Sequence, residues 1–191
     1  MIAQAALQQF STSLGITSIT FIPAGNPPHR YQENDLLNAR RRFKMVELAI
    51  ADNPAFRISD IELKRNERSY TMVTLRGLIK TGQIQPPVPM IIGADALLGL
   101  ASWREPQALI ETVHFLQAPR PGYTPIASIE LEGKPIPLLT SAIEMPALSL
   151  SSSWIRSQLV AQKAELETMR YFLPEPVRQY ILANSLYKAK P

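Results

Sequence analysis

The sequence predicts an α/β fold in which a parallel sheet is flanked by helices. Three apolar runs of strand length, at 19–22, 88–92 and 113–117, each end abruptly in a loop rich in proline or glycine. Segments with helical periodicity separate these runs, so crossover connections must join the strands. In such folds the carboxyl ends of the strands meet at one edge, where ligands bind. We therefore expect one parallel sheet with a single ligand edge.

The first element is a helix that Gly15 ends, and its apolar stripe consists of Ile2, Ala5, Ala6, Leu7 and Phe10. No Ser, Thr, Asp or Asn caps this helix, and Met1 already lies within the periodic pattern. The chain therefore reads as if it begins in the middle of an element.

The run at 19–22 predicts a buried strand that leads into a stiff loop, PAGNPPHR. Prolines fix φ and reduce the entropy of the unfolded loop, so Asn26, His29 and Arg30 would be presented on a preorganised backbone. A histidine and an arginine beside backbone amides suit a phosphate group. A capped turn without a ligand is the alternative.

A helix is expected from a cap at Asp35 to about Asp52, with a basic run, RRRFK, on its surface. We interpret this run as a solvated face, and Arg42 is its best candidate for a ligand phosphate. After Asn53-Pro54 and a short strand in 56–63, Ser69 or Thr71 would start a helix that extends to Ile79. The first-turn N–H groups of such a helix bind anions, and an ordinary cap is the alternative.

The second exit, Gly93-Ala94-Asp95, combines close backbone approach with a carboxylate suited to a ribose hydroxyl. Asp95 could equally be a helix N-cap. Trp103 follows on a short turn, where its ring could stack on a planar ligand or pack in the core. A helix at 106–112 leads to the third strand, whose exit loop carries Arg120. Residues 123–145 are rich in proline with short extended pieces, and we assign them no defined elements.

Serines at 151, 152 and 153 precede the last part of the chain, and Arg156 lies one turn further on. Serine caps with an arginine at this spacing can hold a polyphosphate, and a plain serine cap is the alternative. The segment 171–187 predicts an amphipathic helix that begins at prolines. We expect a single domain over 1–191, of which 147–191 is a C-terminal helical portion.

Composition excludes several classes of protein. With no cysteine among 191 residues, a disulfide scaffold, a thiolate nucleophile and a zinc–thiolate site are ruled out. The two histidines, His29 and His114, neighbour no plausible nucleophile, and we find no metal cluster. A net charge of +4 does not require nucleic acid, and no stretch approaches the ~20 apolar residues of a membrane span. We expect a cytoplasmic protein with neither a nucleic-acid nor a membrane partner, and leave a homo-oligomer open.

Seven ordered motifs resemble one known family, bacterial nicotinate-nucleotide adenylyltransferase, which joins ATP and nicotinate mononucleotide into nicotinate adenine dinucleotide in NAD biosynthesis. These motifs are PAGNPPHR, RRRFKMVELAIADNP, DIELKRNERSYTMVTL, MIIGADALLGLASW, APRPGY, LSSSWIR and LPEPVRQYILANSLY. The resemblance covers about 16–187 and implies a Rossmann-like nucleotidyltransferase of the H-x-G-H type. It also implies Mg²⁺ bound with ATP.

The resemblance assigns roles to residues that match the family's motifs. It implies that Ser69, Tyr70 and Thr71 hold the nicotinate carboxylate and that Trp103 stacks on the pyridine ring. The mononucleotide phosphate would lie near Asn26, His29, Arg30 and Arg120. Gly93 and Asp95 would line the nucleotide cleft, and ATP would be cradled by Ser151, Ser152, Ser153, Ile155 and Arg156. For Arg42 it implies a recurrent position with Met45 as partner.

The chain departs from the family at its start. The signature G-G-T-F-D-P-x-H-x-G-H should directly precede Ile2, and it is absent. We leave the catalytic residues unassigned, with Arg156 and His29 as supporting groups. We expect that a central first strand is missing, through a misassigned start codon or a shortened chain. Two other functions stay open: a sister adenylyltransferase with another phosphorylated acceptor, and a non-catalytic nucleotide-binding remnant.

Overall fold

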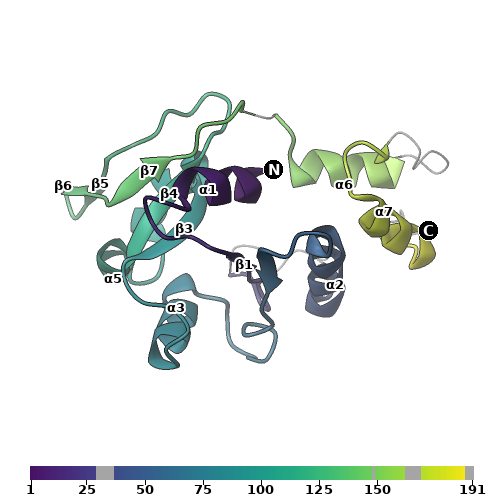
Figure 1. Cartoon of the computed structure of the whole chain (residues 1–191), viewed down its shortest axis with the longest axis horizontal. Coiled ribbons are helices and arrows are strands. Elements are labelled where there is room, and N and C mark those ends of the chain that lie inside the picture. The colour runs from purple at the N-terminus through teal and green to yellow at the C-terminus, as the bar shows by residue number, and fades with distance from the viewer. Residues whose placement is uncertain (29–36, 148, 162–168, 188–191) are drawn as a thin grey trace.

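The computed structural model describes residues 1–28, 37–147, 149–161 and 169–187 (Figure 1). Its helices are α1 (Ile2–Phe10), α2 (Ala39–Ile50), α3 (Thr71–Lys80), α4 (Ala94–Leu98), α5 (Pro106–Thr112), α6 (Ser152–Ala161) and α7 (Glu175–Ala183), with a 3-10 turn η1 (Leu100–Ser102). Its strands are β1 (Ile19–Phe21), β2 (Phe56–Ile58), β3 (Val88–Gly93), β4 (Val113–Ala118), β5 (Ser128–Leu131), β6 (Lys134–Pro137) and β7 (Thr140–Ala142).

The predicted parallel strands are present, and within the described ranges they are divided between two sheets. One sheet has the order β3-β4-β7, and β1 pairs with β2 in the other. Within the described ranges, one edge of β1 and one edge of β3 have no strand partner. The three strand exits therefore do not share a hydrogen-bonded edge. Apolar runs identify strands, but they carry no information on which strands pair.

β4 lies at the centre of the larger sheet and is buried on both faces. Its side chains alternate, as the period of two in a strand requires. Val113 and Phe115 belong to the cluster that contains Met72 of α3 and Leu109 of α5. Leu116 and Ala118 face the other way and join Ala6 of α1. The sheet therefore lies between α1 on one face and α3 to α5 on the other.

β1 is less buried than its sequence predicts. Ile19 and Phe21 are half-buried and Thr20 is exposed, whereas we expected a strand covered on both faces. β1 has only three residues and pairs with β2 alone among the described strands. The ring of Phe21 meets that of Phe56 on β2 edge-on, with centroids 5.3 Å apart.

α2 begins later than predicted. Asn38 is its N-cap, and the Asn38 Oδ1 atom accepts a hydrogen bond from the Arg40 N–H at 2.8 Å. A cap at Asp35 is therefore wrong, and Asp35 itself lies outside the described residues. Asn and Asp cap helices about equally well, so composition alone could not choose between the two positions.

The C-terminal helices form a cluster of their own with α2. Leu159 of α6 and Val177 of α7 pack with Met45 and Leu48 of α2. In Figure 1, α6 and α7 lie on the side of α2, away from β5 and β6. α7 starts after Pro174, so the predicted proline-initiated helix is confirmed, although it is shorter than 171–187.

The segment 123–145, which we could not assign, contains a hairpin and the last strand of the larger sheet. β5 and β6 pair antiparallel across Glu132 and Gly133, whose φ angles are 52° and 75°. Two successive positive φ angles are the mark of a type I′ turn, which suits the twist of a hairpin. No helix in the described part of the chain is long and apolar enough to cross a membrane.

Candidate active site

The loops that follow β1 and β2 are joined by backbone contacts at Asn26. The Asn26 N–H donates to the Ser69 Oγ at 3.1 Å, and the Ser69 N–H donates to the Asn26 carbonyl at 2.9 Å. The Asn26 side-chain amide donates to the Asn66 carbonyl at 3.0 Å. A Cβ atom on Gly25 would lie 2.3 Å from the Glu62 carbonyl oxygen, so only glycine fits there. Two predicted site residues, Asn26 and Ser69, thus form one rigid platform.

Arg42 secures the same loop from α2. Its guanidinium donates to the Gly25 carbonyl and to the Leu37 carbonyl, each at 3.0 Å. Arg42 is half-buried, unlike the exposed Arg40 and Arg41 beside it. The interpretation of the basic run as a solvated face is therefore wrong for Arg42, which binds backbone. A contact between Arg42 and a ligand phosphate stays a prediction.

A buried polar network fixes the start of α3, and sequence reasoning missed it. The Thr74 hydroxyl donates to the Glu62 carboxylate at 2.6 Å, and the Arg65 guanidinium donates to the Thr74 hydroxyl at 2.5 Å. Glu62 is 8% exposed and Thr74 is 3% exposed. A buried carboxylate is costly unless it is paired, so this network holds the loop and the helix in one arrangement. The alternation of the local sequence gives no signal for it.

The N-terminus of α3 lacks the side-chain cap that the sequence suggests. Tyr70 is the N-cap residue and makes no capping hydrogen bond, while the Ser69 hydroxyl is bonded to Asn26 instead. Within the described residues, we find no acceptor for the N–H groups of Thr71 to Val73. Free first-turn N–H groups and the helix dipole together favour an anion.

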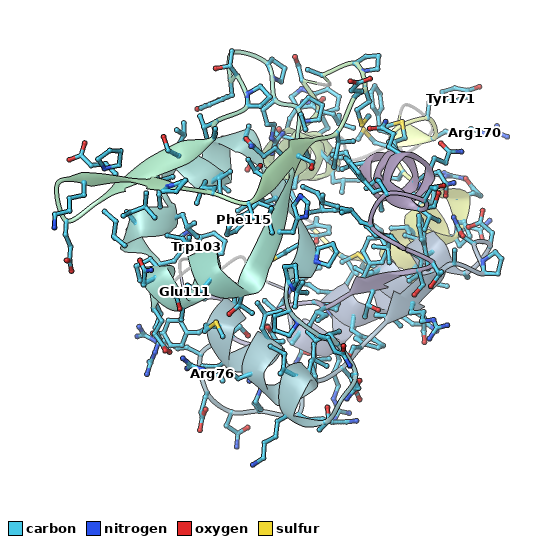
Figure 2. The ribbon with its side chains drawn as sticks, turned by 60° about the vertical axis from the view of Figure 1, so that its left-hand side comes forward. Arg76, Trp103, Glu111, Phe115, Arg170 and Tyr171 are labelled. Carbon is cyan, nitrogen blue, oxygen red and sulfur yellow. The ribbon has the colours of Figure 1, made fainter. Side chains whose placement is uncertain are left out.

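The turn after η1 carries Trp103 and is attached to α3. Trp103 is half-buried and packs against the core cluster that contains Met72 and Leu100. The alternative in which Trp103 packs in the core is therefore confirmed. In Figure 2, Trp103 and Arg76 lie on the same side of the molecule, away from Arg170 and Tyr171. Stacking of Trp103 on a ligand ring stays a prediction.

Two charged contacts make this attachment. The Arg76 guanidinium donates to both carboxylate oxygens of Glu105, with Nη1 to Oε1 at 2.9 Å. This pairing holds the pKa of Glu105 below its usual range and raises the pKa of Arg76. The Arg104 guanidinium lies 4.7 Å from the centre of the Tyr70 ring.

Gly93, Asp95 and Arg120 come together where β3 and β4 end. The Arg120 Nε lies 3.6 Å from the Asp95 Oδ1, so two predicted ligand residues pair with each other. Gly93 is the N-cap of α4, and Asp95 is therefore not the cap that one alternative made it. A Cβ atom on Gly93 would lie 2.4 Å from the Asp95 Oδ1, so the Asp95 side chain would have to move if another residue stood there.

The loop with Arg120 is held by the buried Gln117. The Gln117 side-chain amide donates to the Ile126 carbonyl at 2.7 Å, and its oxygen accepts from the Ile126 N–H at 3.0 Å. Inside this loop, the Tyr123 N–H donates to the Arg120 carbonyl at 3.1 Å across a turn with Gly122 at a φ of 82°. Arg120 thus has a fixed backbone.

The serine–arginine segment begins α6 and is held by local bonds. The Ser151 Oγ accepts from the Trp154 N–H at 3.1 Å, so the serine-cap alternative is confirmed for Ser151. The Arg156 guanidinium donates to the Ser153 hydroxyl at 3.2 Å, and the Ile155 N–H donates to the Ser151 carbonyl at 3.0 Å. Ser152 is the first residue of the helix.

The structure thus brings the predicted residues into separate groups. In the described ranges, no hydrogen bond or ion pair joins α6 to the other predicted site residues. His29 and Arg30 lie outside the described residues. No group of three or more metal-ligating side chains occurs in the part of the chain that the structure describes.

The amino-acid sequence of this chain is similar to those of known proteins. The cytidylyltransferase-like family matches residues 1–158. A Desulfitobacterium hafniense protein is 36% identical over 91% of this chain and 82% of its own length. A Symbiobacterium thermophilum protein is 37% identical over 96% of this chain and 86% of its own length. Both are named as probable nicotinate-nucleotide adenylyltransferases.

Solved structures show the same fold. The Plasmodium falciparum nicotinic acid mononucleotide adenylyltransferase complexed with NaAD has a TM-score of 0.71 and covers 97% of this chain and 90% of its own. The same enzyme complexed with APC gives a TM-score of 0.68. Sequence identity is 17% in both cases, so this likeness concerns the fold alone. The predicted α/β nucleotidyltransferase fold is confirmed.

Proposed function

The chain belongs to the nicotinate-nucleotide adenylyltransferase family, and we propose from this membership that it transfers the adenylyl group of ATP to nicotinate mononucleotide. The products are nicotinate adenine dinucleotide and pyrophosphate. The observation that carries the proposal is the similarity to relatives of that name, which spans 82–86% of their lengths. The reaction belongs to NAD biosynthesis.

The platform and the N-terminus of α3 would receive the mononucleotide. The N-terminus of α3, formed by Ser69, Tyr70 and Thr71, suits the carboxylate of nicotinate. Trp103 on the adjoining turn would cover the pyridine ring. Asn26 and Arg120, together with His29 and Arg30, would face its phosphate. An arginine is well suited to phosphate because its fork of N–H donors matches two oxygens.

The second substrate, ATP, would be bound by α6. Ser151, Ser152, Ser153 and Arg156 would bind the triphosphate, with Gly93 and Asp95 along the cleft. One phosphate oxygen of the mononucleotide attacks the α-phosphorus of ATP, a P–O bond forms, and the bond to pyrophosphate breaks. The step needs no protein nucleophile, since positioning and charge stabilisation suffice.

Mg²⁺ would enter as part of the ATP substrate. A magnesium ion bound to phosphates needs only one or two protein carboxylates and keeps several waters. Asp95 is the carboxylate at this edge of the sheet, and its partner Arg120 lies 3.6 Å away. The described residues fit an ion carried by the nucleotide better than one held by a protein cage.

The experiment that tests this function supplies ATP and Mg²⁺ with three acceptors in parallel: nicotinate mononucleotide, nicotinamide mononucleotide and 4′-phosphopantetheine. Pyrophosphate release and the dinucleotide are both measured, so that ATP hydrolysis is not mistaken for transfer. We expect the highest kcat/KM with nicotinate mononucleotide.

Two other outcomes would overturn the proposal. Preference for one of the other acceptors would indicate a sister adenylyltransferase. Binding of ATP without pyrophosphate release on any acceptor would indicate a nucleotide-binding remnant.

A further inference from the structure

The turn at Trp103–Glu105 places a cation beside the N-terminus of α3. The Arg104 guanidinium lies 4.7 Å from the ring centre of Tyr70, and Tyr70 is the N-cap residue of that helix. Arginine that stacks on an aromatic face keeps the N–H donors at its edge available for hydrogen bonds. The N–H groups of Thr71 to Val73 follow Tyr70 in the first turn of this helix, and the described part of the chain offers no acceptor for them. Two sources of positive potential therefore meet at one place.

Among the residues that the structure describes, Glu105 is the carboxylate recorded beside Arg104. It immediately follows Arg104, and its Oε1 approaches the Arg104 Nε to 3.9 Å. However, both oxygens of Glu105 accept hydrogen bonds from Arg76, with one N···O distance of 2.9 Å. Bidentate pairs of this kind are stronger and more specific than single contacts. Arg76 thus occupies the carboxylate and leaves Arg104 with a long contact only.

We propose that Arg104 is a specificity-determining residue, which favours a pyridine ring bearing a carboxylate over one bearing a carboxamide. In this proposal Arg76 is a positioning residue, because it keeps Glu105 away from Arg104. The inference rests on the proposed function. The physical reason is that a carboxylate gains a charge–charge interaction with Arg104 and with the helix dipole, whereas a neutral amide gains neither.

The test compares nicotinate mononucleotide with nicotinamide mononucleotide as acceptors, and takes the ratio of the two kcat/KM values. Arg104→Gln should lower this ratio roughly tenfold, the size expected for a hydrogen bond to a charged group. The ratio should fall because kcat/KM for nicotinate mononucleotide decreases, while the KM for ATP stays unchanged. Arg57→Gln, which removes an exposed arginine from β2, is the matched control and should leave the ratio unchanged.

A second series tests the role of Arg76. Arg76→Gln releases Glu105, which then pairs with Arg104, so the ratio should fall although Arg76 itself touches no ligand. Arg76→Gln together with Glu105→Gln should restore the ratio, because no carboxylate is left to neutralise Arg104. A purely structural role for Arg76 predicts the opposite, since the double variant also lacks the ion pair. Unchanged selectivity in Arg104→Gln, or no recovery in the double variant, overturns the proposal.

Calorimetric binding of the two mononucleotides without ATP separates this inference from the proposed function. If no dinucleotide forms but the wild type binds the nicotinate form more tightly, and Arg104→Gln loses that preference, the specificity proposal stands while the proposed function fails. Equal binding of both forms by the wild type, or binding of neither, overturns the role of Arg104.

Discussion

The acceptor side of the candidate site and its α6 side are held in place by different kinds of contact. The Asn26 N–H donates to the Ser69 hydroxyl across 43 residues of sequence, and Arg42 donates to the Gly25 carbonyl across 17. At α6, Ser151 and Arg156 bond only to residues three positions away in the contacts that the described chain records for their side chains. The acceptor side is therefore held by hydrogen bonds between distant segments, whereas the recorded hydrogen bonds of the Ser151 and Arg156 side chains are local to the start of α6.

This difference shows what each side can contribute before a ligand arrives. A network that spans several elements is preorganised, so little ordering is needed on binding. A local cap fixes the backbone of one helix end, but it does not determine where that end lies relative to the acceptor. Variants on the acceptor side should thus affect both stability and binding, and variants on the α6 side should affect nucleotide use with little change in stability.

Arg156→Ala is expected to have the largest effect. Removal of one positioned donor to a developing charge costs roughly 100-fold in rate, so kcat/KM for ATP should fall by about that factor. Steady-state kinetics with ATP varied would measure it, and Arg156→Lys should recover part of the loss. A variant with wild-type kinetics would show that α6 does not hold the triphosphate.

Gly25→Ala should break the acceptor platform. The new Cβ atom would lie 2.3 Å from the Glu62 carbonyl, so the backbone must shift, at a cost of about 1–3 kcal/mol in the free energy of unfolding. Its matched control is Gly77→Ala within α3, where the Cβ atom meets only the Ile61 Cδ1 atom at 3.8 Å.

Because alanine has a higher helix propensity than glycine, Gly77→Ala should raise the free energy of unfolding by roughly 0.5–1 kcal/mol. Urea unfolding would give both values, and the KM for nicotinate mononucleotide should rise in Gly25→Ala alone. Equal effects of the two substitutions would argue against the platform.

His114 makes the stability of the larger sheet depend on pH. Burial lowers the pKa of His114, whose Nε2 lies 2.9 Å from the Ser141 hydroxyl. Below about pH 6.5, the ordinary pKa of histidine, the unfolded chain binds the proton more readily, so the free energy of unfolding should fall as the pH decreases from 7 to 5. Denaturant titrations of the wild type and of His114→Gln over this range should diverge, and parallel curves would exclude the effect.

The smallest expected effect is on the pH dependence of unfolding and comes from Glu175 in α7. Hydrogen bonds from Arg178 lower the pKa of this exposed carboxyl to about 2. Its contribution to stability is complete above the usual pKa of 4.5 and is lost as the pH falls from there toward 2. Glu175→Gln should therefore flatten the pH dependence of unfolding only below pH 4.5, which thermal unfolding at pH 3.5 and 6 would reveal.

Local signals predicted the elements well, because periodicity and turn residues determine them. The positions of β3, α5 and β4 follow directly from apolar runs and breakers. Asn38 rather than Asp35 caps α2, and the two residue types cap helices about equally well. Among the described strands β1 pairs with β2 alone, which depends on tertiary contacts that no local pattern carries. The same holds within the site, where Arg76 meets Glu105 across 29 residues and Thr74 meets Glu62 across 12. Types of residue were predictable, but their partners were not.

The primary amide of Gln117 behaves as a surrogate peptide group. It exchanges two hydrogen bonds with the backbone of Ile126, nine residues away, as neighbouring antiparallel strands would. These bonds close the loop between Gln117 and Ile126, which contains Arg120. The entropy of loop closure is therefore lost during folding rather than when a ligand binds. Anion binding at this loop should accordingly show only a small unfavourable conformational entropy in calorimetry. The Gln117→Ala variant, with an open ring, should bind with a more negative entropy.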